Sequence, residues 1–132
     1  MNCPVCKKNA MIVLELDEVE VDYCTECGGI WLDAGELELL LGAAAGAEAL
    51  LKSFQPAKTA EKKRKCPICL RKMDKVSVGE AGGRQELIDR CGKNHGLWFD
   101  RGELQKVLKM GQFDSEGRIK ALLGDLFCIE TD

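Results

Sequence analysis

Eight cysteines and a single histidine are the residues of this chain best suited to chemistry, and most of them are regularly spaced. Two C-P-x-C pairs, Cys3–Cys6 and Cys66–Cys69, are followed at a distance by Cys24–Cys27 and by Cys91 with His95. Close pair, gap and close pair is the order of tetrahedral metal sites, whereas disulfides need no such paired spacing. The pattern predicts bound zinc.

The second cluster differs from the first in its fourth ligand. Asn94 stands where the repeat would place a cysteine, and His95 follows at the position of Gly28. An imidazole reaches further than a thiol and binds zinc well, so we expect a Cys3His site and two zinc ions per chain. The alternatives are that His95 is an incidental polar residue and that Cys128 is the fourth ligand; otherwise Cys128 is a free thiol ending the last helix.

The clusters belong to a duplicated unit. Residues 23–41 return in altered form as residues 90–108, with Trp31 mapping to Trp98 at an offset of 67. A chain of 132 residues divided in this way gives two halves that are too small to fold on hydrophobic burial alone. Metal binding would therefore hold each half together.

Each pair of ligand clusters needs a hairpin to bring it together. Residues 11–16 and 19–23 have strand character, the second with apolar and acidic residues in alternation, and residues 73–78 and 84–90 repeat the plan with a longer loop. Apolar residues at helical spacing follow each cluster. They predict a helix that begins at Ala34 and breaks near Gly42 or Gly46. In the second unit they predict a helix that stops at Gly111 and a last helix over about 115–127.

Two further sets of residues could be assigned chemistry. Asp33 with Glu36, and Asp100 with Glu103, could be paired catalytic carboxylates, but a capping box at each helix start explains them without a reaction. Trp31 and Trp98 could stack on bases. We favour the interpretation that they cover the metal site and hairpin of a small core.

Charge is distributed unevenly along the chain. Residues 1–50 carry ten acidic residues against two lysines, whereas residues 51–65 carry six basic residues against one acidic residue. We expect modules at 1–54 and 66–132 with a polar, basic linker at 55–65. This linker is either a solvated tether or part of a phosphate-contacting patch. The patch would consist of Lys62, Lys63, Arg64, Lys65, Arg71 and Lys72.

Several functional classes lack support in the sequence. A redox C-x-x-C needs a helix starting at the motif, whereas a hairpin is expected here, and four-ligand sites leave no open position for substrate. H-E-x-x-H, phosphate-binding glycine loops and a Ser/His/Asp set do not occur. No apolar run is long enough for a membrane span. Because the expected ligand Cys3 lies almost at the initiator methionine and leaves no room for a signal peptide, we expect a cytoplasmic location.

The first unit resembles a known family on the residues C-P-x-C and C-x-x-C-G-G-I-W-L-D-x-G-E-L. This is the zinc-ribbon domain related to transcription factor IIB, found in many small bacterial proteins. The resemblance covers about residues 3–41 and, less closely, 66–108. It implies a small, metal-stabilised α+β fold of two tandem zinc-ribbon modules, each a zinc-knuckle hairpin followed by one or two helices. It also suggests contact with RNA polymerase or another large machine.

These observations lead to three functional hypotheses. The first is a non-enzymatic zinc-binding adaptor that docks a protein partner. Glu18, Glu20 and Asp22, on one face of the first hairpin, favour this hypothesis. The second is nucleic-acid binding through the linker and second module. The third is a thiol redox enzyme or zinc store. The helices could pack the two modules together or pair two chains as a homodimer, and the sequence leaves both open.

Overall fold

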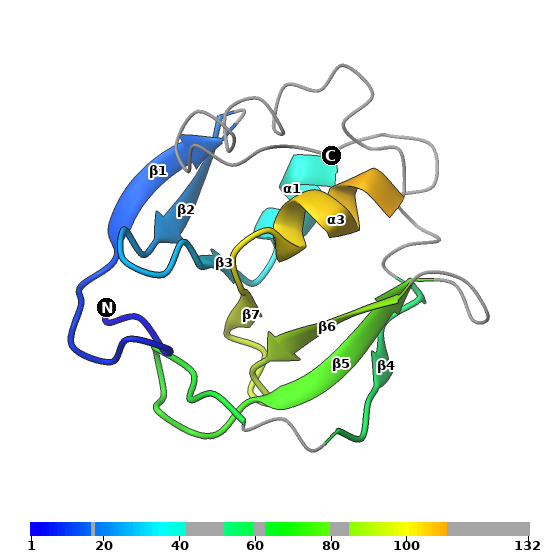
Figure 1. The fold of residues 1–132 in the computed structure, drawn as a ribbon. Helices are drawn as coiled ribbons and strands as arrows, with labels where there is room; N and C mark the ends of the chain where they lie inside the picture. The colour runs from blue at the N-terminus through cyan, green and yellow to red at the C-terminus, as the bar shows by residue number, and fades with distance from the viewer. Residues whose placement is uncertain (17, 42–51, 60–62, 80–84, 111–132) are drawn as a thin grey trace.

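The structure, a computed structural model, describes residues 1–16, 18–41, 52–59, 63–79 and 85–110 (Figure 1). The first module contains β1 (Ile12–Leu16), β2 (Val19–Tyr23), β3 (Ile30–Asp33) and α1 (Glu36–Leu41). Then follow β4 (Gln55–Pro56), β5 (Asp74–Gly79), β6 (Gln85–Arg90), β7 (Gly96–Phe99) and α3 (Glu103–Met110). The expected helix break near Gly42 or Gly46, the stop at Gly111 and the last helix over 115–127 lie outside the described residues.

Both expected hairpins are present. β1 pairs with β2 and β5 with β6, each pair antiparallel, close to the ranges that the alternation of residue types predicts. In β2 the side chains of Val19, Val21 and Tyr23 are buried, whereas Glu20 is exposed. This period of two places one row of side chains in the core and the other on the opposite face of the sheet.

A third strand in each module was not expected from the sequence. Residues assigned only to a link between knuckle and helix form β3 and β7, which pair with each other in antiparallel register. In β3, Ile30, Trp31 and Leu32 are all buried, so the strand shows no alternation of polar and apolar residues. Four residues without a period of two give too little signal to predict a strand.

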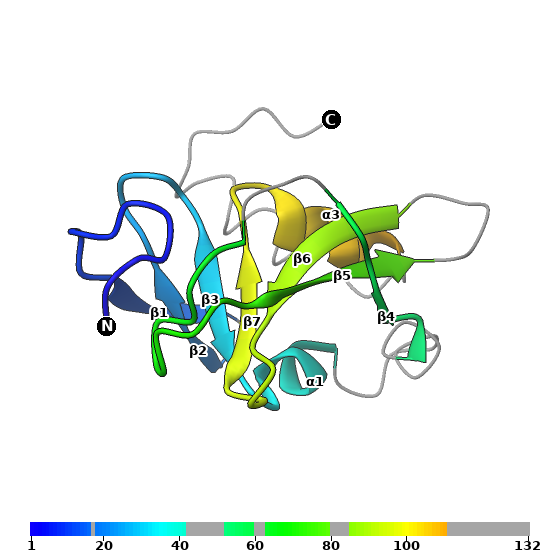
Figure 2. The ribbon, with the colours of Figure 1, turned by 90° about the horizontal axis from the view of Figure 1, so that it is seen from below.

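The β3–β7 pair joins the modules into one seven-stranded sheet, in the order β1-β2-β3-β7-β6-β5-β4. Trp31 lies opposite Trp98, its own counterpart in the repeat, so the modules are related by an approximate two-fold axis at this residue pair. Figure 2 shows the consequence: β3 and β7 run side by side in opposite directions, and α1 and α3 lie near opposite ends of the pair.

The two faces of the sheet have different coverings. Both helices lie on one face, inside the curve of the sheet (Figure 1). There they bury Leu37, Leu40, Leu104 and Val107 against a continuous apolar core. The opposite face carries the two tryptophans under the cysteine knuckles. No helix among the described residues is long and apolar enough to cross a membrane.

The helix starts differ from the expectation. α1 begins at Glu36, two residues after the predicted start at Ala34. Gly35 has a φ of +92°, and Gly102 at the same place in the second module has a φ of +85°. A left-handed residue cannot belong to a right-handed helix, so the glycine delays the first turn.

The stretch expected as a linker is partly built into the second module. Gln55 and Pro56 form β4 on the outer edge of β5, and Ala57 N donates to the Lys75 carbonyl over 3.0 Å. The chain returns to the same edge where the Arg64 carbonyl accepts from Met73 N over 2.7 Å. At least the two ends of this stretch therefore follow the sheet rather than cross open solvent.

Candidate metal centres

The first metal centre forms where the turn before β1 meets the turn after β2. Cys3 and Cys6 lie in a tight turn, in which Lys7 N donates to the Cys3 carbonyl over 2.8 Å. Cys24 and Cys27 lie in the connection from β2 to β3. The sulfur atoms of Cys3 and Cys27 are 3.5 Å apart, and those of Cys6 and Cys24 are 3.8 Å apart. All four sulfur atoms lie within 4.8 Å of one another.

The second centre repeats this arrangement with Cys66, Cys69, Cys91 and His95. Leu70 N donates to the Cys66 carbonyl over 2.8 Å, as in the first turn. The sulfur atoms of Cys69 and Cys91 are 3.7 Å apart. His95 Nδ1 lies 3.4 Å from Cys91 Sγ and 3.8 Å from Cys66 Sγ. The histidine is therefore placed as a fourth ligand.

Both groups fit zinc. With Zn–S bonds of about 2.3 Å and Zn–N bonds of about 2.0 Å, a tetrahedral site places sulfur atoms about 3.8 Å apart and a nitrogen about 3.5 Å from each sulfur. The separations in both centres agree with these values. All seven cysteines of the two centres are free thiols, so none is used in a disulfide. Two zinc ions would each receive a complete set of four protein ligands.

The knuckles position their fourth ligands by different backbone turns. In Cys24–Gly29 and Cys91–Gly96 alike, the first N–H donates to the last carbonyl, over 3.0 and 3.1 Å. The left-handed residue is Gly28 in the first loop, directly after the second cysteine, with a φ of 75°. In the second loop it is Asn94, directly before His95, with a φ of 61°. In the second loop the left-handed residue comes one position earlier after the first cysteine, and the fourth ligand comes one position later. Asparagine is among the residues that tolerate this backbone conformation.

Two thiols of the second centre differ in pKa although backbone N–H groups donate to both. Cys91 Sγ accepts from Lys93 N, and Cys66 Sγ accepts from Ile68 N, each over 3.4 Å. Burial acts to raise the pKa of Cys91, but the N–H groups of His95 and Lys93 outweigh it and lower that pKa to about 7. Burial dominates at Cys66 and raises its pKa to about 11. Zinc binds thiolates, so Cys91 loses its proton readily, whereas zinc must displace the proton of Cys66.

The two tryptophans lie beneath the knuckles and have no exposed surface. Each packs in a second apolar cluster that holds cysteines of both centres together with Met73. The sequence left base stacking as an alternative for these rings, and their burial contradicts it. The interpretation that they cover the metal sites is confirmed.

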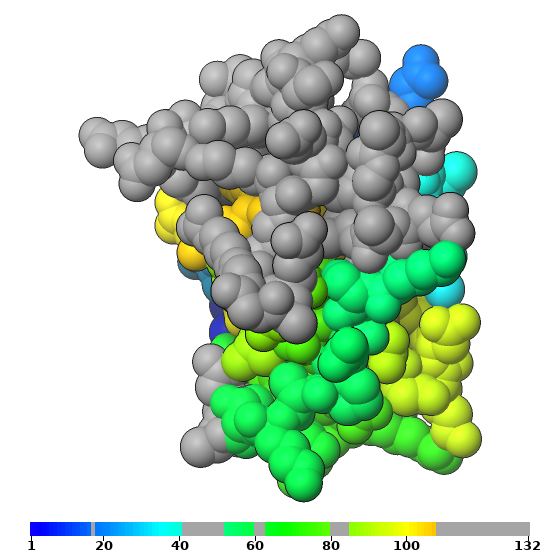
Figure 3. Space-filling view, turned by 90° about the vertical axis from the view of Figure 1, so that its right-hand side faces the viewer, coloured from blue at the N-terminus to red at the C-terminus, as the bar shows by residue number. Residues whose placement is uncertain are grey.

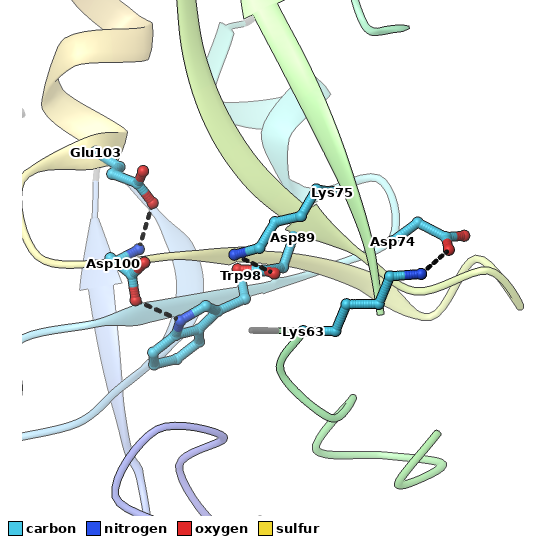
Figure 4. Close-up of polar contacts among 7 residues, drawn as sticks. All are labelled: Lys63, Asp74, Lys75, Asp89, Trp98, Asp100 and Glu103. Atoms are coloured by element: carbon cyan, nitrogen blue, oxygen red, sulfur yellow. Dashed lines mark hydrogen bonds and ion pairs between the residues drawn. The ribbon is translucent and has the colours of Figure 1, made fainter. Parts of the chain in front are cut away.

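A short relay connects each tryptophan to the following helix. Trp98 Nε1 donates to Asp100 Oδ1 over 3.0 Å, and Asp100 N donates to Glu103 Oε1 over 2.8 Å (Figure 4). Trp31, Asp33 and Glu36 make the same bonds over 2.8 and 2.6 Å in the first module. The glutamate half of the expected capping box is therefore present. The aspartate oxygen, however, accepts from an indole, which explains the W-x-D-x-x-E spacing.

A buried ion pair was missed by the sequence analysis. Lys75 Nζ lies 2.9 Å from Asp89 Oδ1, and both side chains are almost fully buried beside Trp98 (Figure 4). Burial raises the pKa of Asp89, and the ammonium of Lys75 acts in the opposite direction. The first module pairs Val13 with Asp22 at the same place, so the repeat itself gave no signal for this pair. Only the register of β5 and β6 identifies it.

The predicted basic patch lies on both sides of the Cys66–Cys69 pair in the sequence. Lys63 Nζ is 3.8 Å from Asp74 Oδ1, with both side chains largely exposed (Figure 4). Arg64 is half-buried, and the remaining described members are exposed. These are Lys65, Arg71 and Lys72, with Lys65 bridged to Lys72 through the backbone. Lys62 and the reserve ligand Cys128 lie outside the described residues.

Both ligand groups lie in segments that match a known protein family. The sequence matches the transcription factor zinc-finger family over residues 2–43 and 65–110, which together exceed half of the chain. Each matched segment contains one complete ligand group, either the four cysteines of the first centre or the Cys3His set of the second. No curated protein and no solved structure matches the chain. Family and geometry therefore agree on zinc.

Proposed function

Because the chain belongs to the transcription factor zinc-finger family, we propose that it is a non-enzymatic adaptor that docks a protein partner of the transcription apparatus. Two structural zinc ions hold the seven-stranded sheet, and the sheet offers the docking surface. Four protein ligands at each centre favour this role, because a catalytic zinc keeps one position open for water or substrate.

The acidic face of the first module carries the proposal. Glu15 and Glu20 are opposed across β1 and β2, and Asp22 and Asp33 continue the same face of the sheet. Burial raises the pKa of Asp22, and the charges of Asp33 and Glu20 raise it further, so these carboxylates are close enough to interact. We call Glu15, Glu20, Asp22 and Asp33 the acidic face.

The second module lacks an equivalent surface. At the places of Glu15 and Glu20 it has Ser77 and Leu87, and its buried aspartate is paired with Lys75. An unbalanced group of carboxylates on one module attracts a basic protein surface and speeds its association. The partner that fits this face therefore carries clustered lysines or arginines.

A pull-down with zinc-loaded protein tests the proposal. Native lysate treated with nuclease should yield a stoichiometric protein at moderate salt, and the Glu15→Lys, Glu20→Lys double variant, which changes two exposed members of the acidic face, should lose it. Glu38→Lys with Glu26→Lys makes the same change in net charge at exposed positions outside the acidic face and serves as the control. Recovery of no stoichiometric protein by the wild type would contradict the adaptor role.

Nucleic-acid binding is the second candidate, favoured by a basic groove in the second module. Lys58, Lys63 and Arg90 line this groove, whose volume is about 340 Å³, with Asp74 as the acidic residue in its lining. Figure 3 shows β4 and the residues after it at the molecular surface on this side. No large aromatic side chain is exposed among the described residues, so the groove has no stacking platform.

Salt dependence separates this candidate from the first. If the groove and the basic patch contact phosphates, affinity for DNA or RNA should fall steeply with salt and weaken when Lys63 and Lys65 become glutamine. Absent or salt-insensitive binding would exclude it. A thiol enzyme or zinc store would instead release its metal to mild chelators, and retention of both ions would exclude that class.

A further inference from the structure

β1 and β5 are equivalent outer strands of the two modules. Val13 on β1 is opposite Asp22, as Lys75 on β5 is opposite Asp89. On the outer side of β5, β4 adds a short antiparallel strand, with Gln55 opposite Ser77 and Pro56 opposite Val76. β1 ends the sheet, with no further strand beside it among the described residues. In the described part of the chain, one of the two equivalent edges therefore has an added strand and the other has none.

The β1 edge is also apolar and exposed. Val13 is 62% exposed and Ile12 is 46% exposed. A sheet edge presents N–H and C=O groups that can pair with another strand, and proteins usually protect such edges with proline, charge or a very short strand. The β5 edge is protected in this way by a two-residue strand that contains Pro56. β1 is longer, at five residues, has no proline, and carries one charged residue, the exposed Glu15.

The equivalence of the edges predicts what a strand added to β1 would meet. In the position that Pro56 and Gln55 take on β5, the added strand would lie beside Leu14 and Glu15. Leu14 is half-buried against the apolar core, so its neighbour should be apolar. Glu15 is exposed opposite Glu20, so its neighbour should be basic.

A second copy of the chain fits this edge poorly. Two β1 strands paired about Leu14 would bring two acidic faces together. Residues 1–50 carry ten acidic residues and two lysines, so such a pair would be repelled. The charge of the edge instead complements a basic segment.

We propose that the outer edge of β1 binds an extended segment of a protein partner as an added antiparallel strand, with an apolar residue beside Leu14 and a lysine or arginine beside Glu15. The inference rests on the proposed adaptor role and specifies the surface and the chemistry of the partner. Backbone pairing supplies affinity, and the alternating side chains supply selectivity.

Peptide binding to the zinc-loaded full chain tests this edge directly. The probes are two eight-residue peptides, one alternating valine with lysine and one alternating valine with glutamate. Amide chemical shifts and hydrogen exchange report where each binds. The valine–lysine peptide should bind more tightly and protect amides in residues 12–16. Glu15→Lys should weaken it about fivefold and improve binding of the valine–glutamate peptide. Glu38→Lys, on exposed α1 surface, should do neither.

The outcomes separate the inference from the function on which it rests. Equal binding of the two peptides, protection away from β1, or absence of binding would overturn strand addition. So would a concentration-dependent dimer in sedimentation whose hydrogen-exchange protection lies on β1. If the pull-down partner is retained by Glu15→Lys with β1 amides unprotected, the adaptor role stands and the strand site fails. If the wild type captures no partner, the adaptor role itself fails.

Discussion

Trp31 on β3 and Trp98 on β7 are directly opposite each other across the strand pair that joins the modules. Each indole also covers a glycine of the other module. A Cβ on Gly29 would overlap the Trp98 ring, and a Cβ on Gly96 would lie 2.7 Å from Trp31 Cζ2. The two modules therefore share one core at this point, and neither zinc knuckle is covered by its own module alone.

Replacing Gly29 by alanine should destabilise both modules together. The added methyl group must displace a fully buried ring, and overpacking of this kind costs about 1–3 kcal/mol. Urea unfolding of the zinc-loaded protein, followed by tryptophan fluorescence, should show a single transition at lower urea. Gly92→Ala is the control, because its Cβ would meet Asp74 Oδ2 only at 3.4 Å. Equal stability of both variants would show that the rings move aside without cost.

The fourth ligand of the second centre can be tested by metal content. His95→Ala should reduce bound zinc from two ions to one, measured by elemental analysis after gel filtration. The double change Asn94→Cys, His95→Gly recreates the cysteine and left-handed glycine of the first knuckle, so it should restore the second ion. Two ions in His95→Ala would mean that another residue, with Cys128 the foremost candidate, supplies the ligand.

The buried pair Lys75 and Asp89 should be far more sensitive to single than to double replacement. Lys75→Met leaves a carboxylate with no exposed surface and no ion-pair partner, which costs about 3–5 kcal/mol. Lys75→Met with Asp89→Leu removes both charges and should recover most of this loss in thermal unfolding. If the double variant is no more stable than the single one, the pair contributes through packing rather than charge.

Glu103 should make stability fall with rising pH. Burial raises its pKa from 4.5 to about 7, so the folded protein holds this proton more tightly than the unfolded chain. The resulting stabilisation is complete below about pH 4.5 and is lost as the pH rises through about 7. Glu103→Gln removes this loss while keeping an oxygen that can accept from Asp100 N.

Unfolding measurements in saturating zinc check the effect. Between pH 6 and pH 8.5, the free energy of unfolding of Glu103→Gln should rise by about 1 kcal/mol relative to the wild type, after allowance for solvent screening. Parallel pH curves for the two proteins would contradict a raised pKa at this carboxyl group.

Much of each metal site could be predicted because its information is local. A thiolate pair separated by two residues wraps one ion within a single turn, so Cys3 and Cys6 identify their role without reference to the rest of the fold. The hairpins follow from alternation in the same way. The third strands were missed because Ile30, Trp31 and Leu32 are buried on both faces, which removes the period that marks a strand.

The amino-acid sequence by itself determined the ligand groups, the metal and the duplication, because each follows from the types and spacing of nearby residues. Only the tertiary structure decided that β3 pairs with β7, that Trp98 covers Gly29, and that Lys75 neutralises Asp89. These contacts join segments far apart in the chain, and strand pairing uses backbone N–H and C=O groups that all residues carry, apart from the N–H that proline lacks. Among the residues that the structure describes, the same pairing leaves β1 as the last strand of the sheet.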